Sequence, residues 1–348
     1  MSNTVDKFFS FPDDVTTAPL ITVCLHKLLG GDVEEHARLF DACKTLGFFY
    51  LDLSDSDEGE ELISGSNDLF DILQDFFQLP LQEKLKYDFA SEGSYFGYKG
   101  MGAEVVDGAG TKDKNEIFNI SKDDIMRLGQ PAPAPEIIRK NRNRLMKYIE
   151  VNNVILETIL YSLASSLQLP ADALTSTHRL RAPSGCHIRF ICAPPQQPDS
   201  ESLALGEHTD FGSLTVLFNR IGGLQVQLPE TAGWVYVRPM PKCAIINLGD
   251  AMVKFSAGIL KSNLHRVVAP PGEQRNLVRY SLVYFSRPEY EVKMQRMQGG
   301  LVDQVMRKEE ETPECTRDWL KRRHQGRKVQ FFKDEATWEH AMGTEVRL

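Results

Sequence analysis

The sequence predicts an α+β protein, in which one antiparallel β core, a sandwich or a small barrel, is flanked by helices. Three observations support this fold class. The first half of the chain carries helical periodicity, short β-rich runs separated by turn residues follow Pro170, and the end of the chain returns to a helical pattern. The 348 residues suffice for one large domain or two ordinary ones, and they contain no internal repeat. We therefore expect a single β core with helices wrapped around it.

The first half of the chain is mostly helical by its pattern. In residues 31–53, Asp32 is a candidate N-cap, and apolar residues then recur with helical spacing as far as Gly47. The sequence FFYLDL after that glycine is typical of a strand. Residues 67–80 predict a second amphipathic helix that ends at its proline, and a long helix is expected from about Pro135 to Leu167.

Between these helices lies a segment that has no regular pattern. Residues 88–115 are rich in glycine, serine and charge, and such a stretch inside a compact protein is usually a lid, a binding loop or a mobile segment. Tyr98 lies within it and Phe118 follows it. Both aromatic residues are therefore candidates for contact with a substrate.

After Pro170 the chain is rich in short β runs with Gly, Pro and Asn turns between them, as in an antiparallel sandwich or barrel. These runs are residues 186–192, 213–218, 223–228, 234–238, 243–247, 264–268 and 278–285. The turn residues at 247–250 are interpreted as setting strand geometry, without a chemical role. The last 55 or so residues predict helix, with Thr312 as N-cap and Pro313 in the first turn.

Composition and charge narrow the classes of partner. The net charge is −8 and the only basic block, KRRHQGRK at 321–328, is expected to be a solvated helix face, so nucleic-acid partners are not expected. We also expect no membrane partner, because the sequence begins without a secretory signal and lacks an apolar run of about 20 residues. The six cysteines include no CxxC pair, which favours reduced thiols and a cytoplasmic location.

One histidine and one aspartate open the apolar run GEHTDFGSLTVL. His208 and Asp210 are two positions apart, so on a strand they point to the same side. Alone, such a pair is more often a solvent-facing turn. A second histidine, His265, lies several β runs further along, and two histidines with one carboxylate are the ligand set of non-haem Fe(II) oxygenases. A small barrel suits this set, because its inward-facing positions converge.

A further pair of polar residues follows in the run RYS. On a strand, Arg279 and Ser281 point to one side, and an arginine with a hydroxyl is what a buried carboxylate needs. If this strand is central, Arg279 requires an anionic partner. The residues alone leave open whether that partner is a structural Asp or Glu or a bound ligand.

These motifs occur in an order that resembles a known family. The runs LGEHTDFGSLTVLF, GGLQV, WVYVRPMP, INLGDAM, SAGILKSNLHRVV and RYSLVYF are similar to the C-terminal half of the Fe(II)- and 2-oxoglutarate-dependent dioxygenases, in the isopenicillin N synthase-like group. PLITVCL, ACKTLGFFYL and FFQLPLQEKLKY resemble its N-terminal half. The likeness covers roughly residues 19–290, and the sequence most resembles fungal members that act in secondary metabolism.

The resemblance implies a fold and an organisation. It implies a double-stranded β-helix, or jelly roll, flanked by N-terminal and C-terminal helices. We expect a mostly helical N-terminal region over residues 1–170, the jelly-roll oxygenase core over 171–295 and a helical extension over 296–348. We expect a monomer.

The resemblance also implies roles for the site residues. His208, Asp210 and His265 match the catalytic iron ligands, and Arg279 and Ser281 match the pair that binds 2-oxoglutarate. The implied cofactors are Fe(II), 2-oxoglutarate as co-substrate and O₂. The implied reaction removes a hydrogen atom from a small-molecule substrate, which leads to hydroxylation, desaturation or ring rearrangement with release of succinate and CO₂.

Two alternatives to this function stay open on the sequence. One is an iron oxidase of the isopenicillin N synthase type that works without 2-oxoglutarate, and the other is a catalytically silent binding module on the same fold. Formation of succinate distinguishes the 2-oxoglutarate-dependent oxygenase from the oxidase. Loss of a triad member would favour the silent module, and none is lost.

The chain departs from the family at one strand. Many relatives carry LRxNYYPP, but here the stretch reads IRFICAPP, which places Ile191 and Ala193 where Asn and Tyr help to seat the co-substrate. Arg189 shares their strand face and is a candidate for substrate contact, with a purely structural arginine as the alternative. Phe211, directly after Asp210, is a further candidate.

Overall fold

The computed structural model describes residues 10–195, 203–306 and 313–325, and its core is a pair of β sheets. The larger sheet has eight strands, in the spatial order β1 (Thr22–Cys24), β2 (Phe48–Asp52), β10 (Cys243–Leu248), β7 (Leu214–Asn219), β12 (Arg279–Ser286), β5 (His187–Ala193), β4 (Glu116–Ser121) and β3 (Gly97–Lys99). The smaller sheet has the order β6 (Leu205–His208), β11 (His265–Val267), β8 (Leu224–Gln227) and β9 (Trp234–Tyr236).

The two sheets form a double-stranded β-helix. Their pairings are antiparallel except for the parallel pair β1–β2. Phe48 and Ile245 of the large sheet and Val226 and Val235 of the small sheet belong to one buried apolar cluster. The inner faces of the sheets therefore pack together at the β2–β10 end, which leaves the β12–β5 end for polar residues.

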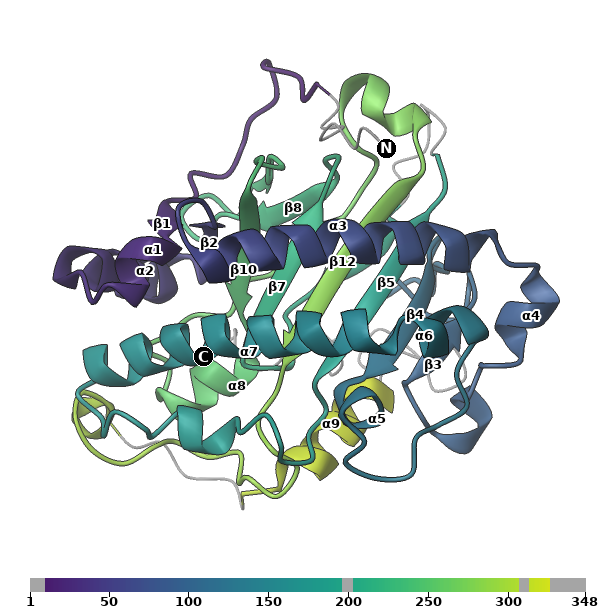
Figure 1. Ribbon diagram of the computed structural model, residues 1–348. Coiled ribbons are helices and arrows are strands. Elements are labelled where there is room, and N and C mark those ends of the chain that lie inside the picture. The colour runs from purple at the N-terminus through teal and green to yellow at the C-terminus, as the bar shows by residue number, and fades with distance from the viewer. Residues whose placement is uncertain (1–9, 196–202, 307–312, 326–348) are drawn as a thin grey trace.

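Helices cover the outer face of the large sheet (Figure 1). The helices of the described residues are α1 (Leu25–Leu29), α2 (Val33–Thr45), α3 (Asp57–Gln78), α4 (Leu81–Leu85), α5 (Lys122–Met126), α6 (Glu136–Lys140), α7 (Arg142–Ser166), α8 (Asp250–Phe255) and α9 (Thr316–Gln325). Helices α3 and α7 run side by side across the sheet, and their buried Phe76, Leu145 and Ile155 contribute to the main hydrophobic core.

The N-terminal helices agree with the sequence pattern except at two places. Asp32 caps α2, because its side chain accepts a hydrogen bond from the Glu35 amide at 3.0 Å. The helix expected over 67–80 begins earlier, since Ser56 accepts from the Gly59 amide at 3.2 Å and acidic residues follow in the first turn. The long helix expected from Pro135 is divided at Asn141 into α6 and α7.

Each of the seven β runs expected after Pro170 coincides with a strand, and the run after Gly47 forms β2. Strand β1 lies in the run PLITVCL, which the resemblance matches to a strand, whereas β3, β4 and β6 were not expected. Two of these three have only three or four residues, too few for an alternating pattern to be recognised. Strands β1 to β4 come from the first 170 residues and complete the large sheet.

The C-terminal expectations need correction. Thr312 lies outside the described residues, and α9 begins at Thr316, beyond Pro313. The expectation that residues 321–328 form a solvated face is wrong for Arg323, which is 2% exposed and pairs with Asp250 at 2.7 Å. Residues 326–328 lie outside the described part of the chain.

All six cysteines are free. Within the described residues, the helices are all too short or too polar to cross a lipid bilayer.

Candidate active site

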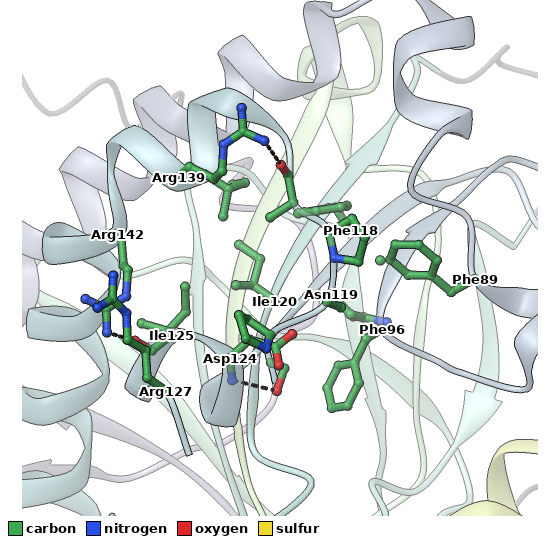
Figure 2. A pocket seen from close by; sticks show the side chains of 17 residues that line it. Phe89, Phe96, Phe118, Asn119, Ile120, Asp124, Ile125, Arg127, Arg139 and Arg142 are labelled. Atoms are coloured by element: carbon green, nitrogen blue, oxygen red, sulfur yellow. Dashed lines mark hydrogen bonds between the residues drawn. The ribbon is translucent and has the colours of Figure 1, made fainter. Parts of the chain in front are cut away.

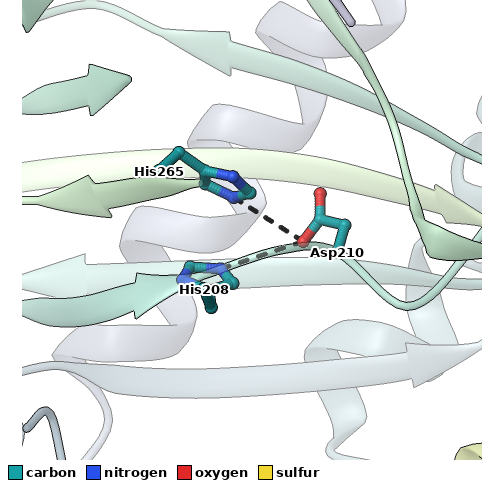
Figure 3. Close-up of side chains that lie close together, drawn as sticks. All are labelled: His208, Asp210 and His265. Atoms are coloured by element: carbon teal, nitrogen blue, oxygen red, sulfur yellow. Dashed lines mark ion pairs between the residues drawn. The ribbon is translucent and has the colours of Figure 1, made fainter. Parts of the chain in front are cut away.

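The small sheet and the loop after it bring His208, Asp210 and His265 together (Figure 3). His208 ends β6 and His265 begins β11, and the two residues are directly paired in the sheet. Asp210 follows β6 and turns its carboxylate toward both rings, with Oδ1 at 3.8 Å from His208 Nε2 and 3.7 Å from His265 Nε2. All three side chains are buried. The two positions of the HxD motif therefore do converge on one point.

Backbone carbonyl groups fix the orientation of both imidazole rings. His208 Nδ1 lies 2.8 Å from the Gly206 carbonyl oxygen, and His265 Nδ1 lies 3.0 Å from that of Asn263. A carbonyl only accepts, so Nδ1 carries the proton and donates. The Nε2 atom of each ring then faces Asp210 and is the ring nitrogen that can bind a metal.

Two side chains hold the carboxylate of Asp210. Its Oδ2 atom accepts hydrogen bonds from Thr215 Oγ1 and from Asn247 Nδ2, both at 2.7 Å. Burial raises the pKa of Asp210, but the imidazoles of His265 and His208 and these two hydrogen bonds outweigh it and lower the pKa to about 2. The carboxylate stays ionised, with Oδ1 directed toward the rings.

This donor set fits a ferrous ion. Two imidazole nitrogens and one carboxylate oxygen lie within 4.8 Å of one another, the only such cluster of three among the described residues. Two histidines and one carboxylate on one side of a metal leave its other positions open, which is the arrangement of Fe(II) oxygenases. The hydrogen bonds on Nδ1 and Oδ2 orient the three ligand atoms.

A second polar group lies at the start of β12. Arg279 is 4% exposed, and it donates from Nε to the Gly222 carbonyl at 2.7 Å and from a terminal nitrogen to Ser281 Oγ at 2.6 Å. Ser281 Oγ in turn donates to Asn219 Oδ1 at 3.0 Å. Burial alone lowers the pKa of Arg279 to about 10, and no Asp or Glu among the described residues forms an ion pair with it. A structural carboxylate partner is thus absent from the part of the chain described.

The family departure lies beside this arginine. Ala193 is paired directly with Arg279, and Ile191 with Ser281. Directly paired residues share a sheet face, so both apolar side chains lie next to the Arg279–Ser281 pair. Neither supplies a hydrogen bond there.

Of the four candidate substrate residues, Phe211 directly follows Asp210, and Arg189 lies on the sheet face that carries Thr215. Arg189 donates from Nε to Asn119 Oδ1 at 2.8 Å and lies over the Phe285 ring at 4.8 Å. Burial lowers the pKa of Arg189 to about 10, and the charge of Asp210 partly opposes this effect. Phe211 is buried beside Asp210, and the Arg323 guanidinium lies 4.4 Å from its ring.

Tyr98 and Phe118 lie on the other face of the large sheet. The Phe118 ring packs on Phe76 of α3 at 4.3 Å, and the Tyr98 hydroxyl donates to Glu116 at 2.7 Å. Phe118 lines a cavity of about 350 Å³ between this face and α5 and α6 (Figure 2). The structure does not bring these two residues to the triad.

Sequence reasoning missed the residues that support the triad. Besides Thr215 and Asn247, these include Asp250, which accepts hydrogen bonds from Thr209 at 2.8 Å and from Arg323 of α9 at 2.7 Å. Residues 247–250 were interpreted as turn formers only, and that interpretation is wrong for Asn247 and Asp250. The available signal was the position of Asn247 inside a strand otherwise made of buried apolar residues.

Two family models match this chain. Residues 184–288 match the 2OG-Fe(II) oxygenase superfamily, and residues 22–141 match the model described as non-haem dioxygenase in morphine synthesis N-terminal. Similar curated proteins include a 2-oxoglutarate-dependent dioxygenase of Aspergillus fumigatus, 31% identical over 85% of this chain and 82% of the relative. Another is the 2-oxoglutarate-dependent dioxygenase gloE of Glarea lozoyensis, 32% identical over 81% of this chain and 84% of the relative.

Solved structures share the fold. A full-length protein of Neurospora crassa in complex with alpha-KG superimposes with a TM-score of 0.74 at 23% identity and covers 90% of this chain and 97% of its own. A 2OG-Fe(II) oxygenase family protein from Caulobacter crescentus superimposes with a TM-score of 0.71 at 22% identity over 88% of this chain and 99% of its own. At such identities the likeness concerns the fold alone.

Proposed function

Because this chain belongs to the 2OG-Fe(II) oxygenase superfamily and is a 2-oxoglutarate-dependent dioxygenase, we propose that His208, Asp210 and His265 bind its iron. We further propose that Arg279 and Ser281 bind the distal carboxylate of 2-oxoglutarate. The three ligand atoms already face one another, and their other polar atoms are engaged by Gly206, Asn263, Thr215 and Asn247.

The observation that carries the co-substrate assignment is the buried charge of Arg279. A guanidinium removed from water without an anionic partner is costly, and a ligand carboxylate supplies that partner. Ser281 already contacts Arg279, so its hydroxyl is placed beside the same anion. With Ile191 and Ala193 apolar, 2-oxoglutarate is held by fewer polar contacts than the family motif provides.

The chemistry divides between the bound groups and the protein. When bound, iron, 2-oxoglutarate and O₂ supply the oxidative decarboxylation to succinate and CO₂ that drives removal of a hydrogen atom from the substrate. The chain holds the metal ligands in fixed orientations through Thr215, Asn247 and the backbone carbonyls. Arg279 and Ser281 orient the co-substrate, while Arg189 and Phe211 border the substrate.

The substrate is a small molecule, and we propose a secondary metabolite, in keeping with fungal relatives such as those of Aspergillus fumigatus and Glarea lozoyensis. Hydroxylation, desaturation and ring rearrangement all begin with the same hydrogen removal. We also propose that the protein is a cytoplasmic monomer without nucleic-acid or membrane partners. The acidic net charge of −8 and the free cysteines support this.

The metal assignment is tested by anaerobic titration with Fe(II). His208→Ala and Asp210→Ala each remove one of three protein ligands, so both variants should lose stoichiometric iron binding and turnover while remaining folded. His36→Ala is the matched control, because His36 contacts Ser162 far from the triad in the sequence. Tight iron binding by both triad variants with activity retained would contradict the assignment. Succinate formed from 2-oxoglutarate by the wild-type protein checks the co-substrate separately.

A further inference from the structure

Two guanidinium groups lie over one aromatic ring on the inner face of the large sheet. The guanidinium carbon of Arg189 is 4.8 Å from the centre of the Phe285 ring, and that of Arg287 is 5.9 Å from it. Arg189 extends from the middle of β5, and Arg287 directly follows β12. Both positive charges therefore lie beside the same ring, and the charge of Arg287 acts on Arg189.

No carboxylate of the described residues forms an ion pair with either guanidinium. Arg189 donates to the neutral amide of Asn119, and Arg287 contacts His324 Nε2 at 3.4 Å. The Nε atom of Arg287 is buried without a hydrogen-bond partner. Burial lowers the pKa of Arg189, the charges of Glu104 and Asp210 oppose this effect, and Arg287 adds to it. The pair thus retains a need for an anion that the described protein does not meet.

The neighbouring histidine does not supply that anion or add charge. Burial, together with Arg287 and Arg189, holds the pKa of His187 well below its usual value. His187 stacks on Phe285 at 4.8 Å and lies 5.6 Å from Tyr95, so it is a neutral part of an aromatic wall. This wall suits the apolar body of an organic ligand.

Arg189 lies on the same face of the large sheet as Thr215, which contacts the triad. Phe285 is paired directly with Thr215, the residue that holds Asp210, so β5 and its Arg189 are two strands away, roughly 10 Å. A methyl group on Gly212 would lie 3.1 Å from Cγ of Arg287, so this side chain passes beside the loop that carries Asp210. Arg189 and Tyr95 also retain part of their accessible surface, so solvent reaches them.

The pair is distinct from the proposed co-substrate position. Arg279 begins β12 and Arg287 follows its last residue, so their Cα atoms are roughly 26 Å apart along the extended strand. One ligand of the size of 2-oxoglutarate cannot contact both ends. An anion bound at Arg189 and Arg287 would therefore belong to a second molecule.

We propose that Arg189 and Arg287 form a subsite for a carboxylate of the substrate, so that the substrate is an organic acid with an apolar body. The inference rests on the proposed function, since it assigns the substrate class of that site. Two planar guanidinium forks match the geometry of a carboxylate. The subsite anchors the acid group and presents the remainder of the molecule to the metal.

The test measures how tightly carboxylic acids and their amides bind to the full-length protein loaded anaerobically with Fe(II) and saturating 2-oxoglutarate. The probes are phenylacetate, 3-phenylpropanoate and 4-phenylbutanoate, each compared with its primary amide by isothermal titration calorimetry. At least one acid should bind about tenfold or more tightly than its amide. Arg189→Gln and Arg287→Gln should each reduce that preference to about threefold or less, whereas the Lys variants should retain part of it.

A control variant and a second signal separate the possible failures. Arg317→Gln makes the same change at an exposed arginine that pairs with Glu291 at 2.8 Å, and it should keep the full preference. The visible absorption of the Fe(II)–2-oxoglutarate chelate reports on folding and on the proposed function in every sample. If that absorption forms but acids and amides bind equally, or none of the probes binds, or the Gln variants keep the preference, the anion subsite is wrong. If the absorption never forms in the wild-type protein, the proposed function itself fails.

Discussion

Asn247 donates a hydrogen bond from Nδ2 to Asp210 Oδ2 at 2.7 Å, and Asn247 is paired with Thr215, which donates to the same oxygen. The pairing of β10 with β7 therefore fixes one oxygen of Asp210 and leaves the other directed toward the two histidines. A polar contact between neighbouring strands sets the orientation of a metal ligand.

Asn247→Ala should weaken Fe(II) binding by about 10- to 100-fold, because Asp210 then rotates more freely and loses a donor. Thr215→Val should act in the same direction, while Thr215→Ser keeps the hydroxyl and should bind iron nearly as well as the wild type. Anaerobic Fe(II) titration checks all three variants. Unchanged affinity in Asn247→Ala and Thr215→Val would show that these hydrogen bonds do not orient the ligand.

Arg279→Ala should weaken 2-oxoglutarate binding far more than iron binding. Truncating a charge-assisted contact to a buried carboxylate costs on the order of 2–5 kcal/mol, which is a factor of roughly 30 or more in affinity. Ser281→Ala removes one neutral donor and should cost on the order of 1 kcal/mol. Both affinities can be measured in the anaerobic Fe(II)-loaded protein. Equal and small effects would place the carboxylate anchor elsewhere.

Ala193→Tyr tests the departure from the family motif. Ala193 is 3% exposed and is paired directly with Arg279, so a tyrosine here enters a filled interior. We expect overpacking, at a cost of about 1–3 kcal/mol in the free energy of unfolding, and no gain in 2-oxoglutarate affinity. Thermal unfolding and 2-oxoglutarate titration should be carried out on the same variant. Tighter co-substrate binding at unchanged stability would mean that the space beside Ala193 is vacant.

His178 should make the stability of the metal-free protein depend on pH. It is 7% exposed, with Nε2 at 2.6 Å from Ser213 Oγ, and burial lowers its pKa to about 4. Below its usual value near 6.5 the unfolded chain binds a proton that the folded protein does not, so this stability is present at neutral pH and is lost as the pH falls. Lowering the pH from 7.5 to 5 should cost about 2 kcal/mol through this residue. Urea unfolding at both pH values checks this, and the His178→Gln variant should lose less stability between them than the wild type. If the variant loses as much stability as the wild type, His178 is not the source of the pH dependence.

The sequence predicted best those features that a short run of residues specifies by itself, through its spacing or its residue types. The HxD motif with its distant histidine predicted residues that the fold does bring together, and the β runs after Pro170 located seven strands. The support around Asp210 was not predictable, because Thr215 and Asn247 come from strands whose pairing depends on the complete sheet. Residue spacing does not encode such a pairing.

The same reason explains one arginine that was misinterpreted and one that was missed. Arg323 belongs to a basic run that normally indicates a solvated helix face, yet its partner Asp250 lies far away in the sequence. Arg287 lies in a run that carries no motif, and its proximity to Arg189 follows only from the pairing of β12 with β5. Long-range pairs of this kind require the tertiary fold.

The most direct test of the metal and co-substrate assignments is a crystal structure of the protein grown anaerobically with Fe(II) and 2-oxoglutarate. We expect iron bound by His208 Nε2, Asp210 Oδ1 and His265 Nε2, with the distal carboxylate of 2-oxoglutarate on Arg279 and Ser281. Iron held by other residues, or a distal carboxylate bound by Arg189 and Arg287 instead, would contradict these assignments.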